Sequence, residues 1–224
     1  MTPVATPFSG IARAARCLCR TALGAALLLA ASALQAHPHS WIDVQSKLVF
    51  AASGQLVAIE QQWTFDELYT SYVVEEMAGG QTATPAVVRQ FAAKVIANLE
   101  PYGYFMDVRA DGKAIKLGKI SEYQSELRGQ RLWLTFVAPL TTPVDPVRQS
   151  TALSVYDPTY FIEMQHENDA AVSLVAAPSA CHTTLQRPTP GKDSMARAFA
   201  MDKTAAVDKT LGRQFAQKVV LACK

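Results

Sequence analysis

Hydrophobic and polar residues alternate along the stretch Trp41–Phe50, in which Ile42, Val44 and Leu48 fall on one side. A period of two places successive side chains on opposite faces of a strand, so this stretch is expected to be a half-buried strand. A second strand is predicted over Leu56–Phe65. The short turn between the two contains glycine, which favours an antiparallel hairpin.

Two helices are expected to follow the hairpin. Asp66 is suited to cap the first, whose apolar residues recur at helical spacing until Gly79-Gly80 ends it. Thr84 is suited to cap the second, with Pro85 at its first helical position, where a missing N–H is tolerated. One apolar face runs along this second helix until Pro101 stops it.

From residue 102 onward, short alternating segments separated by turn residues predict a series of further strands. They are expected at residues 104–110, 113–117, 120–127, 131–137, 151–156, 160–166, 171–175, 181–186 and 214–223. The proline-rich segment 139–146 is predicted to be a loop, and 193–211 either a loosely packed helix or an exposed connector. The pattern predicts an α+β fold, a mostly antiparallel β-sheet domain with two helices inserted after the first hairpin. A C-terminal helix is added if 193–211 is helical.

Residues 1–36 have the composition of a secretory signal peptide. Arg13, Arg16 and Arg20 provide a basic start, and the uncharged apolar run Thr21–Ala36 follows. The alternative is a membrane anchor, but the run is shorter than the ~20 apolar residues that a membrane-spanning helix needs. Cleavage after Ala36 is therefore expected, which leaves a single α+β domain over residues 37–224 in the periplasm.

Composition and charge change this picture only slightly. Half of the 224 residues are hydrophobic and 18% are charged, which is typical of one globular domain. Removing the three arginines of the signal segment leaves 18 basic and 19 acidic residues, so the net charge changes from +2 to −1. Without a dense cluster of Lys or Arg, a nucleic-acid partner is not expected.

Two cysteines, Cys181 and Cys223, lie in the expected mature chain. In an oxidising compartment a disulfide is their expected state, and it would tie the end of the chain to a segment 42 residues earlier. The alternative is a metal site built from the two cysteines, with His182 beside Cys181, although no Cys-x-x-Cys spacing is present.

The main candidate for metal chemistry is the start of the expected mature chain, His37-Pro38-His39. Residues two apart on a strand share a face, so His39 and Asp43 are expected to project together, and the proline favours an extended His37 that joins them. If cleavage exposes His37, a terminal amine is added. Imidazole and carboxylate ligands suit a divalent transition ion such as Ni, Co, Zn or Cu. His166 is a further candidate ligand; the alternative is that these histidines are only solvated.

Sequence signatures of catalysis are missing. The chain contains no Gly-x-Ser-x-Gly, His-Glu-x-x-His, Walker or Gly-x-Gly-x-x-Gly motif. An enzyme is therefore not expected, nor is a small organic cofactor.

Several motifs, taken in order, support a family resemblance. They are His37-Pro38-His39 with Trp41-Ile42-Asp43, Trp63-Thr64-Phe65-Asp66-Glu67, Val155-Tyr156-Asp157-Pro158-Thr159-Tyr160, and the final pair Cys181 and Cys223. Over nearly all of the mature chain, this order resembles the uncharacterised exported proteins grouped as the DUF family numbered 1007. The resemblance implies a periplasmic component of an ABC-type or other transition-metal transport system, with nickel, cobalt or zinc as cargo and an inner-membrane metal transporter as partner.

One segment departs from the pattern of that family. Many relatives have an acidic, glycine-containing insert between the first two helices that is similar to a calcium loop. The equivalent residues 79–84 contain no carboxylate, so calcium binding is not expected there.

Three hypotheses for function follow. The first is a periplasmic metal-binding accessory, or solute-binding component, of a Ni/Co/Zn-type transport system. The second is a copper protein, either a carrier or an oxidative enzyme, that uses an N-terminal histidine. The third is a metal-free interaction module that docks on a membrane transporter. The mature N-terminus tests the second, because a chain that does not start at His37 lacks the amine beside the imidazole.

Overall fold

The computed structural model describes residues 38–79, 84–200 and 208–224. Contacts divide the chain into residues 1–36 and residues 37–224, and the second unit contains the described fold. This fold is α+β, with two sheets of mostly antiparallel strands and a few helices, as the sequence predicts.

The strands are shared between two sheets. The first sheet contains β1 (Ser40–Phe50), β2 (Leu56–Phe65), β5 (Glu122–Arg128), β6 (Arg131–Val144), β8 (Ile162–Gln165) and β9 (Val172–Val175). They lie in the order β5-β6-β2-β1-β8, with β9 also paired to β1. The second sheet contains β3 (Met106–Ala110), β4 (Lys113–Ile115), β7 (Thr151–Val155), β10 (His182–Gln186) and β11 (Lys218–Ala222). Its order is β10-β11-β7-β3-β4.

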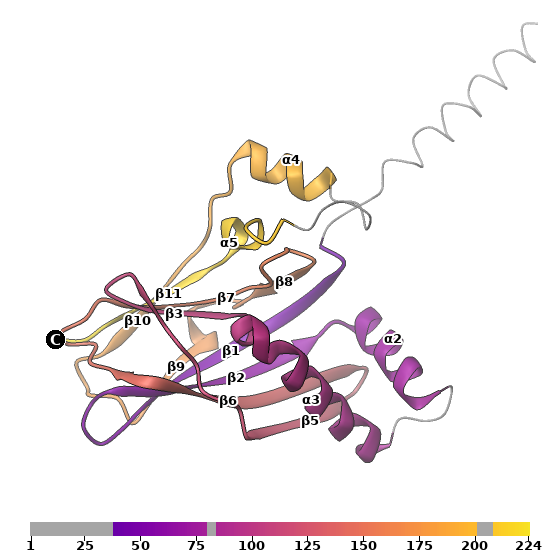
Figure 1. Ribbon diagram of the computed structural model, residues 1–224, viewed down its shortest axis with the longest axis horizontal. Helices are drawn as coiled ribbons and strands as arrows, with labels where there is room; N and C mark the ends of the chain where they lie inside the picture. The colour runs from indigo at the N-terminus through magenta and orange to yellow at the C-terminus, as the bar shows by residue number, and fades with distance from the viewer. Residues whose placement is uncertain (1–37, 80–83, 201–207) are drawn as a thin grey trace, which may run out of the picture. The chain divides into compact units, whose positions relative to one another are not determined.

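Four α-helices and two 3₁₀ turns are described within the three ranges. They are α2 (Glu67–Ala78), α3 (Pro85–Leu99), α4 (Lys192–Ala200) and α5 (Gly212–Phe215), with 3₁₀ turns at Glu100–Phe105 and Asp169–Ala171. In Figure 1, α2 and α3 lie side by side at the β5–β6 end of the first sheet.

The first hairpin follows the hydrophobic pattern of the sequence. Ile42, Val44 and Leu48 of β1 are buried, and β1 pairs with β2 in a register that sets Ile42 opposite Phe65. Gly54 in the connecting loop has a φ of +79°, a conformation that residues with a Cβ rarely adopt. Both predicted strands are confirmed, with ends within one residue of those expected.

Side-chain caps fix α2 and α3 at the predicted positions. The Asp66 carboxylate accepts the N–H of Tyr69 at 2.8 Å, and the Thr84 hydroxyl accepts the N–H of Val87 at 3.3 Å. At the end of α2, Gly79 adopts a φ of +58° and donates its N–H back into the helix. Both predicted helices are confirmed.

The apolar face of α3 packs into the core. Val88, Phe91 and Ile96 are buried, and the Phe91 ring lies edge-on to the Phe65 ring with centroids 5.5 Å apart. The Ser125 hydroxyl of β5 donates to the carbonyl of Val88, which fixes the helix to the sheet. Buried side chains of α3 and of both sheets form one cluster.

Strand β6 is longer than the sequence predicts. Residues 139–144, predicted as part of a loop, continue the strand. Pro139 lacks an N–H, but its carbonyl accepts from Gly118, and the N–H of Thr141 donates to the carbonyl of Lys116. Residues 116–118 thus provide hydrogen-bond partners for the backbone of Pro139 and Thr141. The predicted loop is therefore wrong over residues 139–144, which belong to β6.

Asp157 directs the chain from the second sheet to the first. It is buried, and its carboxylate accepts the N–H groups of Thr159, Phe161 and Ile162 at 2.9, 3.0 and 3.1 Å. These bonds hold a turn in which Tyr160 has a φ of +58°. The strand predicted from Tyr160 therefore begins only at Ile162. β8 and β9 both pair with β1 in parallel, whereas the other pairs of named strands are antiparallel.

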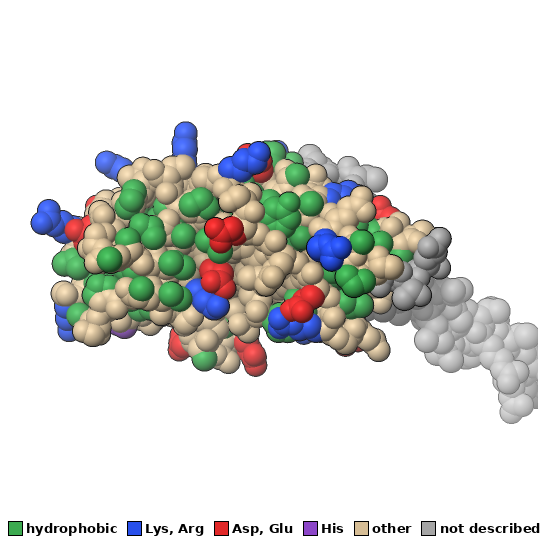
Figure 2. All heavy atoms as spheres, turned by 90° about the horizontal axis from the view of Figure 1, so that it is seen from below, with side chains coloured by type: hydrophobic (Ala, Val, Ile, Leu, Met, Phe, Trp, Pro, Cys, Tyr) green, Lys and Arg blue, Asp and Glu red, His purple; other side chains and the backbone are tan. Residues whose placement is uncertain are grey.

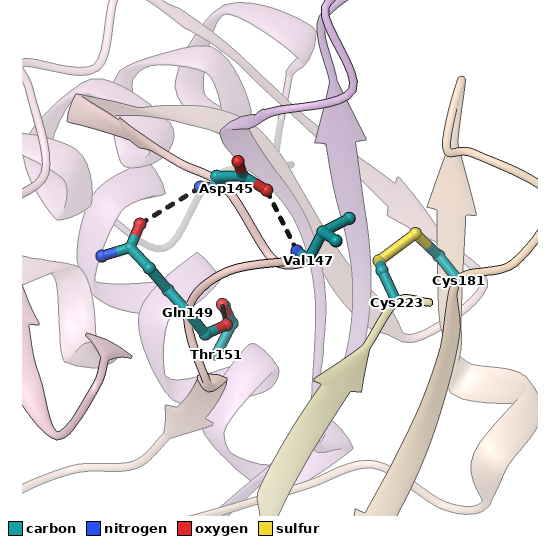
Figure 3. The surroundings of a disulfide bond; sticks show 6 residues. All are labelled: Asp145, Val147, Gln149, Thr151, Cys181 and Cys223. Carbon is teal, nitrogen blue, oxygen red and sulfur yellow. Dashed lines mark hydrogen bonds between the residues drawn. A yellow bond between two sulfur atoms is a disulfide. The ribbon is translucent and has the colours of Figure 1, made fainter.

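The C-terminal part returns to the second sheet. α4 covers the first part of the segment 193–211, and residues 201–207 lie outside the described residues. Phe215 of α5 stacks on Tyr160 with ring centroids 3.9 Å apart. β11 pairs with β10 and β7, and the disulfide between Cys181 and Cys223, shown in Figure 3, closes the β10–β11 pair. The predicted disulfide is confirmed.

The outward face of the first sheet is polar. Its ion pairs are Lys47 with Glu60, Asp43 with Arg131, and Glu126 with Arg128. Figure 2 shows the molecule from below, the side on which the first sheet lies in Figure 1, and acidic and basic side chains there lie next to one another. Charges of both signs are thus mixed on this face.

Candidate functional site

The predicted metal-binding segment enters the fold at the start of β1. His37 lies outside the described residues, so His39 is the first predicted ligand whose position is given. The N–H of His39 donates to the carbonyl of Phe161 at 2.9 Å, and the two rings pack with centroids 4.7 Å apart. His39 is half-buried, and its backbone and ring are both held against the turn that precedes β8.

Asp66 anchors the residues that follow His39. Its carboxylate accepts the hydroxyl of Ser40 at 2.8 Å and the N–H of Trp41 at 2.9 Å, in addition to the cap N–H of Tyr69. Burial acts to raise the pKa of the Asp66 carboxyl, but these hydrogen bonds outweigh burial and hold the pKa below its usual value. A charged carboxylate therefore ties the start of β1 to the start of α2.

Asp43, the second predicted ligand, is engaged in an ion pair. Its Oδ2 lies 2.7 Å from Nη2 of Arg131, whose Nε donates to the carbonyl of Phe65 at 2.8 Å. A strand rises about 3.3 Å per residue, so the Cα atoms of His39 and Asp43 are roughly 13 Å apart. Trp41 lies between them on the same face. The strand therefore holds His39 and Asp43 apart.

His166, the third predicted ligand, lies in the interior. It is 2% exposed, and its Nε2 lies 2.8 Å from the Oγ of Ser46. Gln217 Oε1 accepts the backbone N–H of His166 at 2.6 Å and lies 3.3 Å from Nδ1. Burial lowers the pKa of His166 to about 4, although the Gln217 contact opposes this shift. The imidazole is therefore neutral at pH 7, with Nδ1 donating to Gln217 and Nε2 accepting from Ser46.

The contact with Ser46 continues as a chain of buried hydrogen bonds. Gln61 Nε2 donates to Ser46 Oγ at 2.9 Å, and Trp63 Nε1 donates to Gln61 Oε1 at 3.2 Å. We call Ser46, Gln61, Trp63, His166 and Gln217 the buried polar cluster. It joins β1 and β2 of the first sheet to the residue that precedes β11 of the second.

Of this cluster, the sequence pointed only to His166. Ser46 and Gln61 occupy inward positions on strands whose other inward residues are mostly apolar. A polar group at such a position requires a partner, because leaving it unpaired costs on the order of 1–3 kcal/mol. This break in the apolar pattern is the signal that identifies Ser46 and Gln61. Gln217 precedes a short strand and gives no comparable signal.

Ser46 and His166 have the spacing of a nucleophile and its general base. They are 0% and 2% exposed, however, so a substrate has no access to the hydroxyl. The pair therefore serves packing and hydrogen bonding in the folded chain.

The described residues do not bring the predicted ligands together. His166 follows the residue that pairs with Asp43, but it turns to the inward face of the sheet, whereas Asp43 faces outward. His182 is exposed on β10. Within the three described ranges, no group of three or more His, Cys, Asp or Glu side chains is placed to hold a metal ion.

The alternative of a two-cysteine metal site is wrong. Both sulfur atoms are joined in the Cys181–Cys223 disulfide, so neither is a thiolate ligand.

The geometry defines a class of protein: two β-sheets around a shared core, joined by a buried polar cluster and closed by a C-terminal disulfide. The chain belongs to the family described as "Protein of unknown function (DUF1007)", whose sequence model matches residues 22–223. It is similar to an uncharacterized protein of Haemophilus influenzae, with 30% identity over 192 residues, which cover 84% of this chain and 92% of that protein. The family resemblance is thus confirmed. No helix in the described ranges is long and apolar enough to cross a membrane.

Proposed function

We propose that this protein is an exported accessory of a transition-metal transport system, which binds a divalent ion through His37 and His39 and delivers it to an inner-membrane transporter. The observation that carries the proposal is the anchoring of His39. The backbone hydrogen bond and the ring contact of His39 with Phe161 fix an imidazole directly before β1. His39 comes immediately after His37-Pro38 in the sequence. A ligand held by the fold lowers the entropic cost of assembling a metal site from a chain segment.

The proposed ligand set is smaller than the one the sequence suggests. His37 and His39 supply two imidazoles, and cleavage after Ala36 adds the terminal amine. Asp43 is held by Arg131, and the ring nitrogens of His166 are both used in the interior, so each would have to give up existing partners to bind an ion. Nitrogen ligands of this kind suit nickel, cobalt, zinc and copper.

Export and delivery have separate support. The basic start and apolar run of residues 1–36 support export. The family resemblance supports a role beside a metal transporter. An ion bound near a mature N-terminus would remain accessible for transfer, which a fully enclosed site would prevent.

The test begins with the mature chain. Intact mass spectrometry of protein purified from the periplasm should give a chain that starts at His37, and elemental analysis should find a bound transition metal. Calorimetric titration with nickel, cobalt, zinc and copper is expected to give submicromolar binding for at least one ion.

Variants then locate the site. The double variant His37→Ala, His39→Ala is expected to weaken binding by at least about tenfold, or 1.4 kcal/mol. His182→Ala is the matched control, because this exposed histidine on β10 lies outside the proposed ligand set. If no ion binds, or if the double variant binds as tightly as the unchanged protein, the site assignment is wrong. Metal-free co-purification with a membrane transporter would then favour an interaction module.

A further inference from the structure

A hollow lies on the outward face of the second sheet, away from the buried polar cluster. It is open to solvent, has a volume of about 440 Å³, and is lined by residues of β3, β7 and β11 together with the loop at residues 146–150. Sites for small organic molecules have volumes of roughly 300–1,000 Å³. The hollow is therefore large enough for a ligand of that class.

A small side chain forms the floor of the hollow. Ala152 of β7 pairs with Arg109 of β3 on one side and with Val220 of β11 on the other. All three face outward, because the residues that alternate with them along each strand are buried. The short alanine between two longer side chains leaves a depression, and Ala152 and Val220 make its floor apolar.

The loop beside the hollow is fixed by its own hydrogen bonds. The Asp145 carboxylate accepts the N–H of Val147 at 3.0 Å, and the Asp145 N–H donates to Gln149 Oε1 at 3.2 Å. In Figure 3, Val147 projects from this loop toward the disulfide. Val147 is 58% exposed, so the rim also offers apolar surface.

The charged side chains that line the hollow are all basic: Arg109, Arg148 and Lys218. The Arg109 guanidinium is held in place, because Nε donates to Asp107 at 3.0 Å and Nη1 donates to the carbonyl of Gly112 at 2.8 Å. These two bonds leave Nη2 available to a ligand. A guanidinium fixed in this way needs little further ordering when it binds an anion.

The nearby carboxylates are already engaged. Asp145 pairs with Arg148 at 3.5 Å, and Asp111 accepts the N–H and the hydroxyl of Ser150 at 2.9 and 3.1 Å. Lys218 has no ion-pair partner among residues 38–79, 84–200 and 208–224. Arg109 and Arg148 are thus ion-paired with Asp107 and Asp145, and Lys218 is the basic side chain of the rim whose charge no ion pair within the described residues neutralises.

We propose that this hollow binds a small amphipathic organic anion. Its carboxylate pairs with the basic side chains Arg109, Arg148 and Lys218, and its apolar body lies on Ala152 and Val220. A carboxylate matches the planar fork of a guanidinium, and a short hydrocarbon or aromatic group matches the apolar floor. The site is separate from the proposed metal-binding segment and does not depend on it.

Phenylacetate is the probe, and phenylethanol is its uncharged counterpart. Titration of the purified protein, followed by two-dimensional NMR of the backbone amides, is expected to shift the resonances of Ala152 and Val220. Phenylacetate is expected to bind at least about tenfold more tightly than phenylethanol, because only the anion pairs with the basic rim.

Three variants test the assignment. The double variant Arg148→Gln, Lys218→Gln is expected to weaken phenylacetate binding by about fivefold, since exposed ion pairs each contribute little. Lys94→Gln, on the exposed side of α3, is the charge-matched control and should bind unchanged. Ala152→Leu fills the floor and is expected to abolish binding of both compounds. The exposed positions of Arg148 and Lys218 keep the fold intact.

The proposal is overturned by any of three results. The first is an absence of shifts at Ala152 and Val220. The second is equal affinity for phenylacetate and phenylethanol. The third is unchanged binding in the double variant whose thermal unfolding matches that of the unchanged protein.

Discussion

Replacing His166 by glutamine is expected to remove the acid sensitivity that this histidine gives to the fold. Burial lowers its pKa to about 4 in the folded chain, whereas an unperturbed histidine titrates near pH ~6.5. Between these pH values the unfolded chain binds a proton that the folded chain does not. The free energy of unfolding therefore falls as the pH is lowered through this window.

The size of the effect follows from the two pKa values. A difference of about 2.5 between them corresponds to roughly 3.4 kcal/mol, because each unit is worth about 1.36 kcal/mol. About 2 kcal/mol of this is expected to be lost between about pH 7 and pH 5. His166 is 2% exposed, so solvent has little access with which to screen the effect.

Urea unfolding followed by tryptophan fluorescence measures this effect. Trp63 is 1% exposed and is hydrogen-bonded within the buried polar cluster, so its emission reports unfolding. The unchanged protein should lose about 2 kcal/mol more than His166→Gln between about pH 7 and pH 5. His182→Gln is the matched control, because His182 is exposed on β10 and lies outside the buried polar cluster.

One result would refute this reasoning. If His166→Gln loses as much stability on acidification as the unchanged protein, the buried imidazole does not control the acid response. A lower stability of His166→Gln at neutral pH would not rescue the argument, because a lost hydrogen bond to Ser46 costs on the order of 1 kcal/mol at any pH.

Two further predictions concern stability: one tests the disulfide, and the other tests the close packing at Gly212. Replacing Cys181 and Cys223 by serine is expected to lower the free energy of unfolding by about 4 kcal/mol, by the chain-entropy account of a loop spanning 42 residues. Thermal unfolding with and without reductant measures this, and an unchanged midpoint would contradict it. Gly212→Ala is expected to cost at least about 2 kcal/mol, because the added Cβ would lie 1.8 Å from the carbonyl oxygen of Asp157. Gly191→Ala, with nothing within 4 Å of the added Cβ, should stay close to the unchanged protein in the same urea titration.

The elements that the sequence predicts well are those controlled by neighbouring residues. Alternation fixes β1 and β2, and the side chains of Asp66 and Thr84 fix where α2 and α3 begin. Periodicity and capping act within one turn or one strand, so they need no knowledge of distant partners. The disulfide belongs with them only because two cysteines allow a single pairing in the expected mature chain.

The predictions that failed depend on contacts with distant segments. The backbone of Pro139 and Thr141 is satisfied by residues 116–118, so prolines that suggest a loop lie within β6. Tyr160 adopts a positive φ because Asp157 binds the N–H groups around it, which delays the start of β8. Sequence periodicity contains no information on such partners.

For the candidate site, the sequence by itself determined which side chains have metal-binding or titrating chemistry: the histidines, the carboxylates and the cysteines. Tertiary structure alone decided what each one meets. His166 contacts Ser46 across 120 residues of chain and Gln217 across 51, and Asp43 meets Arg131 across 88. These pairs form because strands far apart in sequence lie close together in the first sheet, and because the two sheets share one core, which brings Gln217 to His166. Such packing turns one predicted ligand into a buried neutral histidine and another into half of an ion pair.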